Sequence, residues 1–151
     1  MRRFLRAISV QPLASSMLTP RVLLVRAQSS LRTPLADATF HRLADSLLQR
    51  IETAAQSLED SIDGADVSYA QGVLSLQLGP RGTFVLNKQA PTRQIWWSSP
   101  VSGPRRFEWD ESTRAWVDAR SGGELIAALA DEVRALTGVS LAVKQERPTL
   151  S

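Results

Sequence analysis

The segment that begins near Phe40 carries an apolar residue at every third or fourth position. This spacing matches the turn of an α-helix and predicts one buried helix face over about 22 residues. Thr39 is suited to cap the start of the helix, and Gly64 is suited to end it because glycine tolerates left-handed geometry. The apolar positions are Leu43, Leu47, Ile51, Ala54, Leu58 and Ile62.

Short segments with strand-like alternation follow, and turn residues such as Gln71-Gly72 and Gly79-Pro80-Arg81-Gly82 separate them. The connections are too short to hold helices, so we expect consecutive strands to pair as an antiparallel meander. The predicted strands are residues 67–69, 73–78, 83–88, 94–98, 106–109 and 115–117.

A second amphipathic segment precedes Gly138, which is suited to stop a helix. The order helix, strands, helix, with one apolar face on each helix, predicts an α+β fold. We expect a two-layer α/β sandwich in which the N-terminal and C-terminal helices pack on one face of the antiparallel sheet and leave the other face open. The apolar positions of the second helix are Leu125, Leu129, Val133 and Leu136.

Two tryptophans, Trp96 and Trp97, are adjacent in one predicted strand, so their side chains must point to opposite faces of the sheet. One should enter the core beneath the helices and the other should lie on the open face. An exposed tryptophan beside polar groups is a typical interface anchor, although half-buried packing without any partner is the alternative. We expect Trp109 and Trp116 to belong to the core.

The positive charge of the chain is concentrated at its N-terminus. The whole chain has a net charge of +3 and a pI near 10.2, but residues 1–36 hold six arginines and no Asp or Glu. The remaining residues hold 12 basic and 15 acidic side chains, a net charge of −3. This balance, and the lack of paired aromatic residues on adjacent strands, counts against an RNA-binding sheet and against nucleic acid as a partner.

The composition of residues 1–36 is typical of a mitochondrial transit peptide, being rich in arginine, free of acids and amphipathic at its start. A basic arm without a targeting role is the alternative, and a secretory signal is disfavoured because no long apolar core follows Arg2-Arg3. The longest early aliphatic run, residues 22–25, is too short to span a membrane. We therefore expect a disordered, cleavable transit peptide at 1–36, a folded domain at 37–142 and a C-terminal tail at 143–151.

The chain contains no cysteine and a single histidine, His41. This excludes disulfides, thiolate nucleophiles and cysteine-ligated metal or clusters. Carboxylates must therefore hold any metal, and such oxygen ligands suit weak, exchangeable binding of hard cations. His41 is expected to be an ordinary solvated histidine rather than a ligand.

The stretch from Ile51 to Pro80 holds five acids and no Lys or Arg. Asp45, Glu52 and Glu59 are seven residues apart, so they fall on one stripe of the first helix. Unpaired like charges repel, and a multivalent cation relieves that repulsion. From the residues alone, a solvated helix face remains the simpler interpretation.

Two runs, TFVLNKQAP at residues 83–91 and QIWWSSPVSGPRRFEW at residues 94–109, resemble the signature of the frataxin family. The signature is long and therefore specific, and the similarity spans residues 40–141. The resemblance implies an iron-binding regulator or iron chaperone that activates the cysteine desulfurase–scaffold complex in iron–sulfur cluster assembly. It also implies a location in the mitochondrial matrix, no membrane association, a monomeric state and weakly bound iron (Fe²⁺/Fe³⁺). The alternative is a ferroxidase that oxidises Fe(II) to Fe(III) and stores the product, so whether the chain is an enzyme stays open.

The resemblance also assigns the candidate residues, none of them catalytic. It places Trp96 on the open face and Trp97, at a usually aliphatic position, in the core. Several positions that are often acidic in the family hold Ser or Gln here, which implies fewer or weaker iron sites. The implied metal-binding residues are Asp45, Glu52, Glu59, Asp60, Asp63 and Asp66, and the implied partner-binding residues are Asn87, Gln89, Gln94, Trp96 and Arg106.

Overall fold

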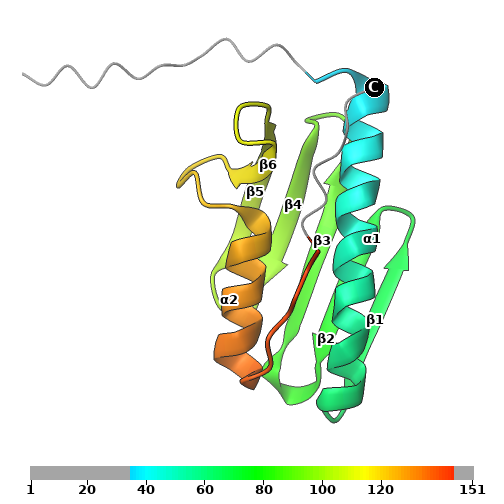
Figure 1. Cartoon of the computed structure of the whole chain (residues 1–151), viewed down its shortest axis with the longest axis vertical. Coiled ribbons are helices and arrows are strands. Elements are labelled where there is room, and N and C mark those ends of the chain that lie inside the picture. Colours follow the sequence, from blue (N-terminus) through cyan, green and yellow to red (C-terminus); the bar gives the residue numbers. More distant parts are fainter. Residues whose placement is uncertain (1–34, 145–151) are drawn as a thin grey trace, which may run out of the picture. The chain divides into compact units, whose positions relative to one another are not determined.

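The computed structural model describes residues 35–144, so the predicted transit peptide falls almost entirely outside the described residues. Within these residues, six strands form one antiparallel sheet in chain order, and both helices cover the same face of it (Figure 1). This confirms the predicted α+β sandwich. The elements are α1 (Asp37–Ser61), β1 (Ala65–Ala70), β2 (Val73–Leu78), the 3-10 turn η1 (Gly79–Arg81), β3 (Thr83–Gln89), β4 (Gln94–Ser99), β5 (Gly103–Asp110), β6 (Ala115–Asp118) and α2 (Leu125–Thr137).

The start of α1 differs from the prediction. The helix begins at Asp37, its N-cap residue is Ala36, and no side chain caps it, so the predicted Thr39 cap is wrong. Thr39 already lies in the first turn of the helix. The carboxylate of Asp37 instead places a negative charge at the positive end of the helix dipole, where it is stabilising.

The helix ends agree better with the sequence pattern. The last helical residue of α1 is Ser61, and Gly64 adopts a φ of +72° in the turn that leads to β1. Gly138 ends α2 as predicted, with a φ of +74° and an N–H that donates to the carbonyl of Arg134. A residue with a side chain would be strained at either glycine.

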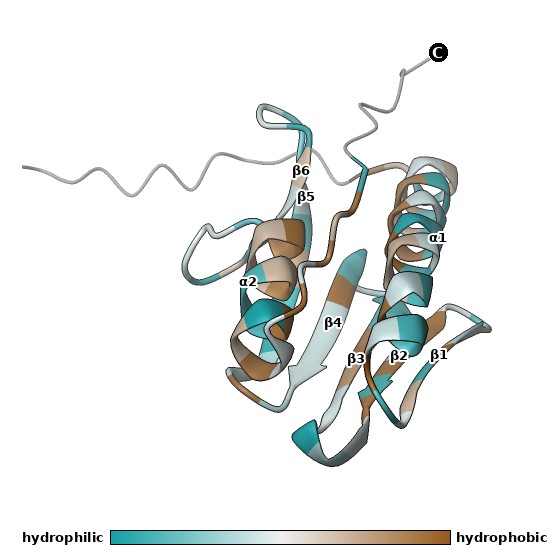
Figure 2. Ribbon diagram, turned by 60° about the horizontal axis from the view of Figure 1, so that its bottom comes forward, coloured by the Kyte–Doolittle hydropathy of each residue, from teal (hydrophilic) through white to brown (hydrophobic). Residues whose placement is uncertain are grey.

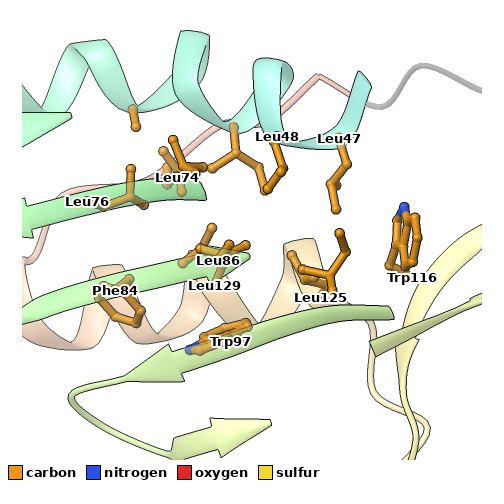
Figure 3. Close-up of a cluster of buried hydrophobic side chains, with 14 of the residues drawn as sticks. Leu47, Leu48, Leu74, Leu76, Phe84, Leu86, Trp97, Trp116, Leu125 and Leu129 are labelled. Atoms are coloured by element: carbon orange, nitrogen blue, oxygen red, sulfur yellow. The ribbon is translucent and has the colours of Figure 1, made fainter. Parts of the chain in front are cut away.

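The core lies between the two helices and the sheet. Leucines of α1 and α2 point toward the apolar side chains of β2, β3 and β4, and Trp116 closes one end of the cluster (Figure 3). Apolar residues, coloured brown, recur along both helices and along the strands beside them (Figure 2). Burying each such leucine stabilises the fold by about 1.5–3 kcal/mol. The predicted helix face is confirmed, except that Ala55 is fully buried and Ala54 only partly.

The segment after α2, residues 139–144, returns between the two helices and covers the core there (Figures 1 and 2). Leu141 is buried, and Val139 and Val143 pack against the core beside it. Nη1 of Arg50 on α1 donates to the carbonyl of Lys144 at 2.8 Å. The end of the described chain is therefore held to α1.

Candidate functional site

The two adjacent tryptophans of β4 lie on opposite faces of the sheet. Trp96 is 37% exposed on the open face, whereas Trp97 is 2% exposed in the core. The ring of Trp97 stacks on Phe107 at 5.4 Å and meets the edge of Phe84 at 6.0 Å. The predicted facing of the pair is thus confirmed, and only Trp96 can meet a partner.

Trp96 sits at the centre of a three-strand patch. The register pairs it with Asn87 of β3 on one side and with Arg106 of β5 on the other. The guanidinium carbon of the exposed Arg106 lies 4.7 Å from the centre of the Trp96 ring, a cation–π contact. Gln89 and Gln94 pair with each other two register positions further along, which is the next pair on the same face. The structure therefore brings together all five residues predicted to bind a partner.

A chain of hydrogen bonds holds the Trp96 ring. Nε1 of Trp96 donates to Oε1 of Gln94 at 3.0 Å, and Nε2 of Gln94 donates to Oε1 of Glu108 at 2.8 Å. Glu108 was not predicted as part of the site. Its signal in the sequence is its position two residues after Arg106, which places it on the same face of the same strand. We name Asn87, Gln89, Gln94, Trp96, Arg106 and Glu108 the open-face patch.

Asp45, the first acid of the helix stripe, already has hydrogen-bond partners within the protein. Its Oδ1 accepts hydrogen bonds from Nζ of Lys88 at 2.5 Å and from the hydroxyl of Tyr69 at 3.1 Å. Burial, the hydrogen bond to Asp45 and the charges of Asp45 and Glu52 together raise the pKa of Tyr69 to about 12. Any cation binding Asp45 must compete with the ammonium group of Lys88.

Glu59 also has a partner within the protein, because its Oε1 accepts a hydrogen bond from the backbone N–H of Val67 at 2.8 Å. Val67 belongs to β1, an edge strand, so this bond covers one donor of the open edge. Asp45 and Glu59 thus contact residues of β1, and the charge of Glu52 acts on Tyr69 of the same strand, so the three acids share one helix stripe as their spacing predicts.

Three exposed acids, Asp60, Asp63 and Asp66, surround the end of α1 and the start of β1. The last turn of α1 contains no basic residue, although the negative end of the helix dipole lies there. Within residues 35–144, no three acids or histidines converge closely enough to chelate one metal ion. The donors are hard oxygens suited to iron, but their spread fits loose binding completed by water rather than a fixed coordination site.

The contacts of His41 are with residues at the start of α1 and not with the acids near its end. Its Nε2 is 3.8 Å from Oδ2 of Asp37, and its ring meets the edge of Phe40 at 5.4 Å. His41 therefore packs near the N-terminus of α1.

A buried charged cluster behind the open-face patch was not predicted. Nε of Arg105 donates to Oδ2 of Asp118 at 2.7 Å, and Nη1 of Arg105 lies 3.9 Å from Glu132 of α2. Ser99 of β4 donates a short hydrogen bond to Glu132. Burial by itself would raise the pKa of Asp118, but the hydrogen bonds from Arg105 and from the backbone N–H groups of residues 120 and 121, with the charge of Arg105, lower it to about 2. The cluster ties β4, β5, β6 and α2 together.

Comparison with known proteins gives the family. The family model described as "Frataxin-like domain" matches residues 33–139, which is more than half of the chain. The chain belongs to the frataxin family.

Several curated members of the frataxin family are similar to the chain in sequence. It is 46% identical over 108 residues to "Frataxin, mitochondrial" of Arabidopsis thaliana, covering 69% of this chain and 57% of that protein. It is 40% identical over 100 residues to "Frataxin homolog, mitochondrial" of Schizosaccharomyces pombe, covering 65% of this chain and 63% of that protein. The chain thus spans less than two thirds of the length of these relatives.

Solved frataxin structures have the same fold. A trimeric frataxin from Saccharomyces cerevisiae, described as complexed with ferrous, is 35% identical with a TM-score of 0.59, covering 74% of this chain and 98% of that one. A frataxin from Psychromonas ingrahamii, 23% identical with a TM-score of 0.62, covers 74% of this chain and 100% of that one. Neither helix within residues 35–144 combines the length and apolar character that a membrane span requires.

Proposed function

We propose that this frataxin-family protein is an iron-binding regulator that activates the cysteine desulfurase–scaffold complex in iron–sulfur cluster assembly. The observation that supports this most is the open-face patch, in which an exposed Trp96 is held in one orientation by Arg106 and Gln94. A rigid aromatic ring on a sheet without covering helices is suited to anchor a protein partner.

The patch offers two kinds of contact to that partner. The Trp96 ring supplies apolar area, and the exposed Arg106 and half-buried Asn87 supply hydrogen-bond donors at either side of it. The planar guanidinium of arginine can donate two parallel hydrogen bonds to one carboxylate. The partner surface should therefore combine an apolar cavity with an acidic or carbonyl-rich rim.

Six acids, which we name the acidic stripe, would bind iron weakly and near the β1 edge, away from the open-face patch: Asp45, Glu52, Glu59, Asp60, Asp63 and Asp66. Support comes from the exposed hard-oxygen donors Asp60, Asp63 and Asp66, and from the yeast relative described as complexed with ferrous. The same negative field would also steer a basic partner surface toward α1. Iron is thus proposed as cargo or signal, and not as a resident cofactor.

We also propose that the protein acts in the mitochondrial matrix. The relatives are named as mitochondrial, and residues 1–36 have the composition of a transit peptide. A monomer is the state that the family resemblance implies, whereas two solved structures of the yeast relative are described as trimeric. Sedimentation of the full chain with and without Fe(II) separates these two states.

Desulfurase turnover by the assembled complex tests the function. Sulfide release should rise when the full chain is added, and Fe(II) should change the size of that effect. Trp96→Ala should lose most of the activation, while Val101→Ala, an exposed apolar residue outside the patch, should keep it. An unchanged turnover with the wild-type chain contradicts the proposal. Oxygen uptake with Fe(II) above the buffer rate, abolished by substituting the acids, would support the ferroxidase instead.

A further inference from the structure

The amide of Gln94 is oriented by the groups on either side of it. It accepts from Nε1 of Trp96 through Oε1 and donates to Glu108 through Nε2. The opposite orientation would bring the amide N–H₂ against the indole N–H and the amide oxygen against a carboxylate oxygen. Both contacts would be repulsive, because each would pair two donors or two acceptors. The observed orientation satisfies both neighbours, and Glu108 anchors the amide of Gln94 on the side away from the tryptophan.

We propose that Glu108 is a positioning residue that fixes the Trp96 ring for partner binding, and that Gln94 relays this effect instead of contacting the partner. The inference rests on the proposed function for its partner, but its geometry is independent of it. Arg106 lies against the ring of Trp96, while the hydrogen-bond chain holds the ring through its N–H. A ring fixed at both its face and its N–H loses little rotational freedom on binding.

The charge of Glu108 strengthens the last hydrogen bond in the series that runs from Trp96 through Gln94. A hydrogen bond to an ionised acceptor is about twice as strong as one between neutral groups, so the Gln94 amide is held firmly. Glu108→Ala removes the acceptor that anchors the amide, so the Gln94 side chain can leave the indole N–H and adopt other rotamers. Glutamine at the same position keeps an oxygen acceptor at the required place and should restore the orientation in part.

The hairpin of β5 and β6 offers a matched control. Nε1 of Trp109 donates to Oε2 of Glu111 at 2.8 Å, so here a glutamate accepts directly from the indole N–H, with no glutamine between them. Trp109 packs partly against the core, so Glu111→Ala removes an equal charge, together with a direct indole contact, away from the open-face patch.

The test combines indole ¹H–¹⁵N spectra of the full chain with desulfurase turnover. The chain has four tryptophans, so each indole N–H can be assigned by single substitutions. Glu108→Ala should shift the Trp96 indole signal, speed its hydrogen exchange, and weaken binding of the desulfurase–scaffold complex roughly five- to tenfold. Glu108→Gln should recover part of both effects, and Glu111→Ala should move only the Trp109 signal.

The two readouts separate the possible failures. An unchanged Trp96 signal in Glu108→Ala overturns the positioning role, whatever the turnover assay gives. A shifted signal with unchanged binding overturns the functional part, because the ring orientation would then not matter. If the wild-type chain does not activate the complex at all, the proposed function fails. The indole signal alone then shows whether Glu108 positions the Trp96 ring. Urea unfolding of each variant shows whether loss of fold explains any change.

Discussion

Arg105 and Arg106 each lie against a tryptophan, one on either face of the sheet. The guanidinium carbon of Arg105 is 5.5 Å from the centre of the buried Trp97 ring, and that of Arg106 is 4.7 Å from the exposed Trp96 ring. The register of β4 and β5 pairs the same residues, Trp97 with Arg105 and Trp96 with Arg106. The buried pair therefore sets the position of the exposed pair through the shared backbone.

Asp118 should make the protein sensitive to acid. The pKa of this carboxyl is lowered from 3.8 to about 2 in the folded state, so the charged form stabilises the fold above pH 3.8. That stabilisation is lost as pH falls from about 4 toward 2, and the shift corresponds to about 2 kcal/mol. Urea unfolding of the wild type should show the free energy of unfolding falling across this pH range. Asp118→Asn should be less stable at neutral pH, and its free energy of unfolding should change less with pH over the same range.

Asp131 provides the control for this experiment, because it is exposed on α2. Asp131→Asn removes the same charge and should leave the pH dependence close to that of the wild type. Equal acid sensitivity of Asp118→Asn and the wild type would show that other carboxyls cause it.

The two tryptophans of β4 should separate stability from function. Trp97→Ala opens a cavity between Phe84 and Phe107 and should cost about 3–5 kcal/mol of unfolding free energy. Trp96→Ala removes a partly exposed ring and should change stability by about 1 kcal/mol or less. Thermal melts of the two variants decide this, and a larger loss for Trp96→Ala would contradict the assigned faces.

The fold was largely predictable, because each helix has a single apolar face and the strand connections are short. The start of α1 was not predictable, because the pattern that marks Thr39 as a cap cannot show that the helix already begins at Asp37. The buried cluster of Arg105 and Asp118 was also missed. These residues are 13 positions apart, and charged residues in a strand give no signal of burial until the register is known.

The site was predictable only where local geometry determines it. Alternation predicts that Trp96 and Trp97 face opposite ways, and helical spacing predicts the stripe of Asp45, Glu52 and Glu59. Neither rule shows that Lys88 crosses from β3 to Asp45, or that Glu59 accepts a backbone bond from β1. Such contacts depend on the packing of α1 over the sheet.

Tyr69 should report on Asp45 directly, since it is the single tyrosine of the chain. Burial raises its pKa first, and the hydrogen bond and charge of Asp45 raise it further, to about 12. Asp45→Asn should therefore lower the pKa of Tyr69 toward its ordinary value near 10 without reaching it, because the burial remains. Ultraviolet titration of the tyrosinate measures this, and Asp60→Asn, an exposed change on the same helix, should have no effect.

Competition between Lys88 and a bound cation gives the last prediction. Nζ of Lys88 lies 2.5 Å from Oδ1 of Asp45, so a metal ion at this carboxylate must displace the ammonium group. Mn²⁺, a paramagnetic and redox-stable probe for Fe²⁺, should broaden backbone signals around Asp60, Asp63 and Asp66 at lower concentration than signals around Asp45.

Lys88→Met removes the competing cation and retains the apolar stem that passes close to Gly72. In this variant, the signals around Asp45 should broaden at metal concentrations that leave them sharp in the wild type. Arg81→Met removes one positive charge at an exposed position and should not produce this change, because the donors to Asp45 within the described chain are Tyr69 and Lys88. Broadening centred on Asp110 and Glu111 in either protein would place the metal on the β5–β6 hairpin and contradict the acidic-stripe assignment.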